Sequence, residues 1–209
     1  NGTPSIPGAS VTVAGDIVIA SNSWIYPHSH PTNGGSAVFY VNNFTVLPTT
    51  IGGVNADYRG FRRGGSDATG RGPGGGGTDS GGGYGGVGAY ISVPSQAGTT
   101  YGSSNAPVDP GSGGAGEQYA ASQGGNGGGS IQIHATRTAT ISGILSANGQ
   151  QAPNGYGGGA GGGIYLTCRY FKGDANGIIR ANGGKGDDGI HFFRTGGGGG
   201  RIAIRQEGP

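Results

Sequence analysis

The sequence has a single cysteine, Cys168, and no methionine. One cysteine cannot form an internal disulfide, so a disulfide-stapled scaffold is excluded. Cys168 alternates with Leu166, which predicts a small, inward-facing apolar residue instead of a reactive thiol. Charged residues make up only 11% of the chain and leave a formal net charge of +2, so we expect no nucleic-acid partner. No apolar run approaches the roughly 18 residues of a membrane helix, so we expect no membrane span.

Glycine is the abundant residue, with 54 of the 209 positions, and proline adds 11. The glycines are phased against β-branched segments, which argues against disorder, and they show no Gly-X-Y period, which excludes collagen. Each ordered glycine costs roughly 0.5–1 kcal/mol more backbone entropy than alanine. We therefore expect main-chain hydrogen bonding and close backbone packing in place of an apolar core. Stacked parallel strands and a packed array of extended polyglycine helices both meet this need, and the sequence leaves the two open.

An internal repeat organises the C-terminal part of the chain. The glycine runs 127–129 and 161–163 lie 34 residues apart, and so do the Ala-Asn-Gly triplets 147–149 and 181–183. Each repeat holds short segments of alternating apolar residues, which are typical of strands. The repeat predicts an all-β fold, a right-handed parallel β-helix or β-solenoid with glycine-rich turns. Asn148 and Asn182, each before a glycine, are expected in left-handed turns.

We expect one glycine-rich β domain over residues 1–209, in three parts. Residues 1–57 form N-terminal strands, 58–129 a glycine- and tyrosine-rich insertion, and 130–209 the 34-residue repeats. Helical periodicity is absent. Strands are predicted at residues 11–13, 17–19, 37–41, 44–47, 89–93, 131–133, 164–166 and 202–204. The insertion is either disordered or packed as extended segments with tyrosines as spacers.

Two places could hold a metal ion, although ordinary loop residues are the favoured interpretation of both. His28 and His30 put two imidazoles on one side of an extended segment, which is half of a zinc-type site. Asp187 and Asp188, in a turn with glycine on either side, could offer oxygen ligands to Ca²⁺. The spacing matches neither the EF-hand loop nor the nonapeptide calcium repeat, so we expect no cofactor, with calcium as the one ion to consider.

Other residues suggest contact with sugars. Trp24 and Tyr26 lie in a polar, aromatic loop and are candidate ligand-binding residues for a glycan. Asn43 begins an Asn-Phe-Thr sequence that fits the N-glycosylation acceptor pattern. A polysaccharide-cleaving β-helix enzyme would need clustered carboxylates with a basic residue. The only available set is Asp174, Asp187, Asp188, Arg180 and Arg205, and turn positions scatter it, so we expect no enzyme.

Several motifs resemble a class of glycine-rich modules found in exported bacterial surface proteins and in some eukaryotic glycine-rich proteins. They are the glycine run before 131–133, the segment 143–149, residues 101–103 followed by 110–114, and the glycine run that leads into 201–204. The resemblance covers roughly residues 46–205. It implies a secreted or cell-surface location and a structural or adhesive role, with no catalytic residues to transfer.

These observations favour a non-enzymatic extracellular structural protein that polymerises with itself, head to tail, into a filament or surface polymer. The open rung at each end of a β-solenoid is an unpaired edge. Residues 6–19 and 201–205 are the expected edges, where a strand exchange with the next subunit is conceivable. The alternatives are a cell-surface adhesion or glycan-binding module and a polysaccharide-cleaving β-helix enzyme.

Overall fold

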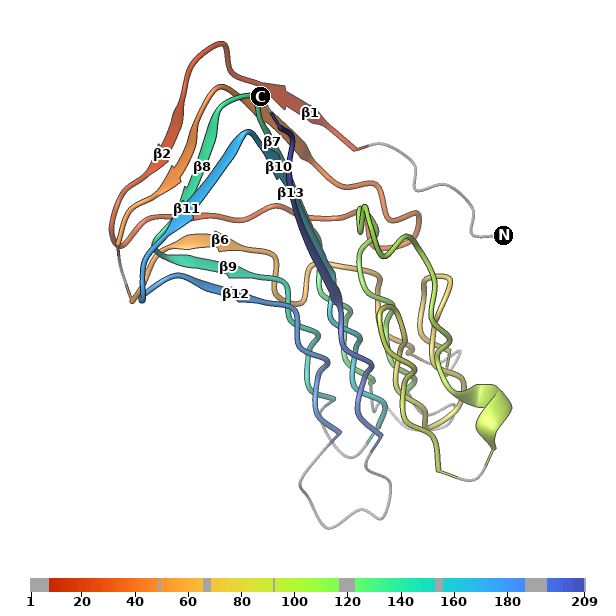
Figure 1. The fold of residues 1–209 in the computed structure, drawn as a ribbon. Helices are drawn as coiled ribbons and strands as arrows, with labels where there is room; N and C mark the ends of the chain where they lie inside the picture. Colours follow the sequence, from red (N-terminus) through yellow and green to blue (C-terminus); the bar gives the residue numbers. More distant parts are fainter. Residues whose placement is uncertain are drawn as a thin grey trace.

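The computed structural model describes residues 8–48, 50–65, 69–91, 93–116, 123–152, 156–186 and 195–208. Its strands form three parallel sheets that stack as the chain winds around a common axis (Figure 1). Sheet A contains β1 (Ser10–Thr12), β4 (Val38–Val41), β7 (Ser130–Ala135), β10 (Gly163–Cys168) and β13 (Arg201–Gln206). Sheet B contains β2 (Ile17–Ile19), β5 (Phe44–Val46), β8 (Thr138–Ile141) and β11 (Tyr170–Gly173). Sheet C contains β3 (Trp24–Ile25), β6 (Gly53–Asn55), β9 (Ile144–Ser146) and β12 (Ile178–Arg180). The predicted all-β, β-solenoid-like arrangement is confirmed.

Each coil contributes one strand to each sheet in turn, and the register between coils differs from sheet to sheet. In sheet C, Ile178 pairs with Ile144, which keeps the 34-residue spacing of the sequence repeat. In sheet A, Ile164 pairs with Ile131, one residue short of that spacing. In sheet B, Tyr170 pairs with Thr138, two residues short. The corners between strands therefore differ in length from coil to coil, while the parallel pairing is kept.

The solenoid has an apolar interior, so the expectation that no such core exists is wrong for this half of the molecule. Alternation along the strands sends every second residue inward. One inward column in sheet A consists of Val11, Phe39, Ile133, Leu166 and Ile204. Its middle members are buried, with Ile133 and Leu166 fully so. Short β-branched strands thus build a narrow core from few side chains.

The other half of the molecule is built from extended glycine-rich segments that project from the corner between sheets C and A (Figure 1). In residues 157–162 each main-chain N–H donates to another segment, and the same partner segment returns every third residue. The donor pairs are Gly157 and Ala160 to 112–115, Gly158 and Gly161 to 195–198, and Gly159 and Gly162 to 147–150. A period of three residues is that of the polyproline II helix. The polyglycine-type alternative is therefore the one realised in the glycine runs.

Six such segments surround the central one. They are residues 80–89, 111–115, 123–129, 147–152, 181–185 and 195–200, each hydrogen-bonded to residues 157–162. Every segment in this ring is also hydrogen-bonded to the next one around it, so the packing is hexagonal. We call this array the glycine bundle. Its interior is held by main-chain amides and not by side chains.

Close approach is the reason that glycine is required in the glycine bundle. A Cβ atom on Gly161 would overlap the carbonyl oxygen of Ala181, and one on Gly127 would overlap that of Gly111. Most of the described glycines have ordinary backbone angles, because positive φ values occur only at Gly34, Gly53, Gly72 and Gly102. Steric exclusion of a side chain, and not left-handed geometry, therefore explains this composition.

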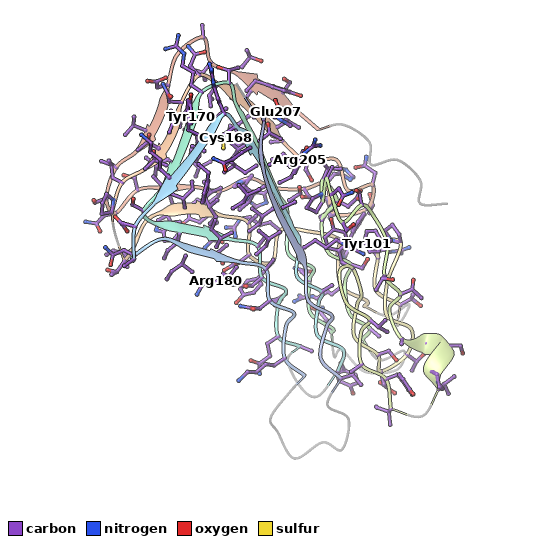
Figure 2. All side chains as sticks on the ribbon, viewed as in Figure 1. Tyr101, Cys168, Tyr170, Arg180, Arg205 and Glu207 are labelled. Carbon is purple, nitrogen blue, oxygen red and sulfur yellow. The ribbon has the colours of Figure 1, made fainter. Side chains whose placement is uncertain are left out.

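The insertion between β6 and β7 packs into the glycine bundle, with tyrosines between its segments. Tyr84 is fully buried, 4.8 Å from the ring of Tyr101, and the Arg201 guanidinium lies 5.7 Å from the Tyr84 ring centre. These contacts connect the bundle to the start of β13. The strand predicted at residues 89–93 is wrong: the described residues there are exposed coil, followed by the 3₁₀ helix Pro94–Gln96. Side chains are dense around the solenoid and sparse along the bundle (Figure 2).

The Ala-Asn-Gly triplets do not form left-handed turns, contrary to expectation. Among the described non-glycine residues, positive φ occurs only at Asn22, Tyr58 and Asp79. Asn148 and Asn182 instead stack along the solenoid: the Asn182 N–H donates to Asn148 Oδ1 at 2.9 Å. The Asn148 side chain thus links successive coils at the junction with the glycine bundle.

Candidate functional site

The aromatic residues predicted to bind a ligand are brought together by β3 and the turn after it. The rings of Trp24 and Tyr26 stack with centroids 6.1 Å apart at an interplanar angle of 27°. Tyr26 is about half exposed, and the Arg59 guanidinium lies 4.7 Å from its ring centre, a cation–π contact. The sequence did not indicate that Arg59 lies beside these aromatic residues, because Arg59 is more than thirty residues away in the insertion.

The two histidines lie in the same region, and both use ring nitrogens as acceptors. Arg59 Nε donates to His28 Nε2 at 3.1 Å. His30 Nδ1 lies 3.1 Å from Thr32 Oγ1 and 3.3 Å from the Asn33 N–H. A hollow of about 170 Å³ opens beside His28, between Arg59 and Arg62. Within the described ranges no group of three metal-ligating side chains is gathered, and the metal prediction at these histidines stays a prediction.

Asn43 lies at a corner of the solenoid, where its side chain joins three coils. Its Nδ2 donates to Asp16 Oδ1 at 2.8 Å, and its Oδ1 accepts from the Thr138 N–H at 3.1 Å. A glycan on Nδ2 would take one of its two hydrogens and stand beside the bond to Asp16. The calcium prediction at Asp187 and Asp188 lies outside the described residues.

The remaining members of the hypothetical catalytic set are spread over the solenoid. Asp174 lies in the turn after β11, where its Oδ1 accepts from the Asn176 N–H at 2.8 Å. Arg180 is on β12 in sheet C and donates from Nε to Ser146 Oγ, whereas Arg205 is on β13 in sheet A. The described part of this set therefore occupies a turn and two different sheets.

The outer face of sheet A carries an aromatic column that the sequence reasoning missed. Tyr40 and His134 pair in register, and their rings stack 5.0 Å apart; Tyr165 meets His134 edge-on at 5.6 Å. Thr167 Oγ1 lies 2.9 Å from His134 Nδ1. Burial lowers the pKa of His134 below its ordinary value, with a smaller opposing effect from Glu207. The sequence pattern that could have revealed this column is alternation: each of these residues follows or precedes an inward-facing apolar residue of its strand, and therefore faces outward.

Within the described residues, the N-terminal end of the solenoid presents three strand edges that no further strand covers. β1, β2 and β3 are the terminal strands of their sheets. All residues of β1 are exposed, Val11 at the end of the inner column included. None of these three strands contains a charged residue. The strand edges of this end are therefore uncharged, and Asp16, in the exposed turn between β1 and β2, is a charged residue of the same coil.

The C-terminal end presents the opposite edges of the same sheets, on β11, β12 and β13. Ile178 and Ile202 are each 44% exposed there, although Ile202 continues the buried column of Ile131 and Ile164. A groove of about 560 Å³ runs along β13 and is also lined by Ser104 and Asn105. It touches four consecutive residues, 202–205, so it follows the open edge of the strand. Figure 2 places Arg180, Arg205 and Glu207 at this end.

No protein-family model, curated protein or solved structure matches this chain. Among the described residues there is no helix that is long and apolar enough to cross a membrane. The two open ends are the candidate functional site, because they are the surfaces where exposed apolar residues coincide with unpaired backbone.

Proposed function

We propose that the chain is a non-enzymatic extracellular structural protein whose copies join head to tail into a filament or surface polymer. One observation carries the proposal: the two ends of the sheet stack expose opposite edges of the same three parallel sheets. Such edges are templates for strand addition, and a non-closing head-to-tail contact generates a fibre. The extracellular location follows from the resemblance to exported glycine-rich modules.

The apolar interior supports the same arrangement. The inner column of sheet A ends in Val11, 37% exposed, at one end and in Ile204, 36% exposed, at the other. A second copy stacked on the C-terminal end would cover Ile202 and Ile204 as the intermediate coils cover Ile131 and Ile133. Removing apolar surface from water contributes about 25 cal/mol per Å², so the exposed ends favour association.

Charge supports a head-to-tail over a tail-to-tail contact. The strands of the C-terminal end carry four basic residues, Lys172, Arg180, Arg201 and Arg205. Two acidic residues, Asp174 and Glu207, directly follow β11 and β13, so the end remains net basic. Two such ends facing each other would bring like charges together, which is unfavourable. The uncharged N-terminal strands meet the basic end without this repulsion. We also propose that the coils are closed and right-handed, the hand that parallel crossover connections adopt.

The test is the assembly state of the purified chain, followed by sedimentation velocity and electron microscopy over a wide range of concentration. The expected result is fibres for the unaltered chain and their loss in Ile202→Lys and Ile178→Lys. Leu47→Lys is the control, because Leu47 is similarly exposed but lies beside β5 in an inner coil. A monomer at every concentration, without fibres, would overturn the proposal.

A second candidate function is glycan binding, favoured by the stacked Trp24–Tyr26 pair with Arg59 beside it. Exposed aromatic faces next to hydrogen-bonding side chains suit the apolar and hydroxyl faces of a sugar ring. Binding to a glycan array that is lost in the double variant Trp24→Ala/Tyr26→Ala would support it. Equal binding by the variant, or no binding by the parent chain, would count against it.

A further inference from the structure

The three sheets of the solenoid do not contain the same number of strands. Sheet A has five, whereas sheets B and C have four each. A fibre of identical copies that continues all three sheets needs an equal number from each copy. Simple stacking of β1 of a second copy on β13 would leave one strand position empty in sheet B and another in sheet C. The strand numbers balance only if one strand of sheet A is replaced at each junction.

From this imbalance we propose that β13 is a donor strand: it displaces β1 of the next copy and pairs with that copy's β4. Each copy then contributes four strands to every sheet, since sheet A runs β4, β7, β10, β13 and on to the next β4. At the same junction β2 of the next copy pairs with β11, and its β3 pairs with β12. The inference rests on the proposed head-to-tail assembly and names the strand that forms its junction.

The register of sheet A shows that β13 fits the position of β1. Ile204 occupies the same inward column as Val11, and Arg205 the same outward column as Thr12. β13 places Ile202 and Ile204 at the positions of Ala9, just before β1, and of Val11, so the replacement covers more apolar surface. The backbone direction also agrees, because every pairing in sheet A is parallel.

β1 is the strand of sheet A that is most readily replaced. It has three residues, all exposed, and pairs with β4 through three positions. β13 has six residues that pair with β10 through six positions, and its other edge borders the groove beside Ser104 and Asn105. That groove gives the incoming β4 edge room to approach. The new pairing is limited by β4, which has four residues and pairs with the six-residue β7 through four positions. An exchange therefore replaces a three-position pairing by one of up to four positions, and it keeps all six positions between β13 and β10.

Cysteine pairs distinguish the exchange from simple stacking. In the Cys168→Ala background, the exchange places position 205 of one copy beside position 40 of the next, whereas simple stacking places it beside position 12. Adjacent strands lie about 4.8 Å apart, within the range that a disulfide spans. The expected result is that oxidation of Arg205→Cys/Tyr40→Cys fibres gives a covalent ladder of multimers, and that Arg205→Cys/Thr12→Cys gives none. Within one copy, β7 and β10 separate position 40 from position 205.

A lock on β1 provides the second arm of the experiment. Thr12 and Tyr40 are partners in register, so Thr12→Cys/Tyr40→Cys in the same background fixes β1 on β4 when oxidised. The exchange predicts monomers when the pair is oxidised and fibres after reduction, with the two single cysteine variants forming fibres under both conditions. Val11→Lys, which weakens β1, should leave fibre formation unchanged or make it faster.

The outcomes separate this inference from the proposed function. Fibres of the oxidised lock, or a ladder from the 205–12 pair, would overturn the exchange and leave the head-to-tail polymer standing. Loss of fibres in Val11→Lys would likewise overturn the exchange. If neither the parent chain nor any variant polymerises, the proposed function and the exchange fail together.

Discussion

Asn182 and Asn148 are joined across two coils of the solenoid, the main-chain N–H of the first donating to the side-chain Oδ1 of the second at 2.9 Å. The row continues to Asp57, whose carboxylate accepts from the Asn148 N–H at 2.6 Å and from Ser146 Oγ at 2.6 Å. These residues stand where sheet C gives way to the glycine bundle. This row of hydrogen bonds thus aligns successive coils at the point where the solenoid continues into the glycine bundle.

Replacing Asp57 tests this row. Asp57→Ala removes the acceptor of the Asn148 N–H and of Ser146 Oγ in a partly buried place, and an unpaired buried donor costs roughly 1–3 kcal/mol. We expect a loss of unfolding free energy in that range, measured by chemical denaturation. Asp174→Ala is the matched control, because that exposed carboxylate caps only its own turn. Equal losses in the two variants would contradict the role of the row.

Gly161 and Gly199 form a matched pair for the glycine bundle. A Cβ on Gly161 would overlap the Ala181 carbonyl oxygen, whereas one on Gly199 would meet nothing within 4 Å. Overpacking of a tight interior typically costs about 1–3 kcal/mol, so we expect Gly161→Ala to lower the melting temperature clearly. Gly199→Ala should leave it unchanged or raise it, since alanine restricts the unfolded chain. Thermal unfolding followed by circular dichroism makes the comparison, and equal effects would count against steric exclusion.

The lowered pKa of His134 predicts that the folded chain loses stability in mild acid. Burial lowers its folded-state pKa below the ordinary value of about 6.5, so the unfolded chain binds the proton more readily. The stabilising contribution of the neutral ring is complete above about pH 6.5 and is lost as the pH falls through the folded pKa. We expect the fall in melting temperature from neutral to acidic pH to be smaller in His134→Gln than in the parent chain. An identical fall in both would contradict this assignment.

Cys168 should resist thiol reagents as long as the solenoid is folded. Its side chain is 1% exposed within the inner face of β10, and burial raises the pKa of the thiol. Because the thiolate is the reactive form, both effects suppress reaction. We expect an aromatic disulfide reagent to label the folded chain slowly and the denatured chain at once. Rapid labelling without denaturant would show that this end of the solenoid opens readily.

The sequence was sufficient for the strands with clear apolar alternation, but it predicted no strand at β3, β8 or β11 and one at residues 89–93 that does not form. Alternation of Ile, Val and Leu marks β7, β10 and β13 directly, and the 34-residue spacing indicates the stacked coils. The hexagonal glycine bundle depends on which runs become neighbours, and a run such as 157–162 carries no side-chain pattern that identifies six partners. The contact between Arg59 and Tyr26 could not be predicted for the same reason, because it depends on how the insertion folds back onto the solenoid. The left-handed turn predicted at Asn148 was wrong because an Asn-Gly pair is also compatible with a turn. The hydrogen bonds that Asn148 makes depend on Asp57 and Asn182 in the neighbouring coils, which the local sequence does not identify.

The interior of the glycine bundle has a consequence for how the molecule responds to temperature. Unfolding exposes apolar surface with a positive heat-capacity change of about 0.45 cal/K/mol per Å², whereas newly exposed amide surface contributes about −0.26. A half that is packed with peptide groups should therefore offset much of the heat capacity that the Ile- and Val-lined coils contribute. The free energy of unfolding would then vary little between cold and warm conditions.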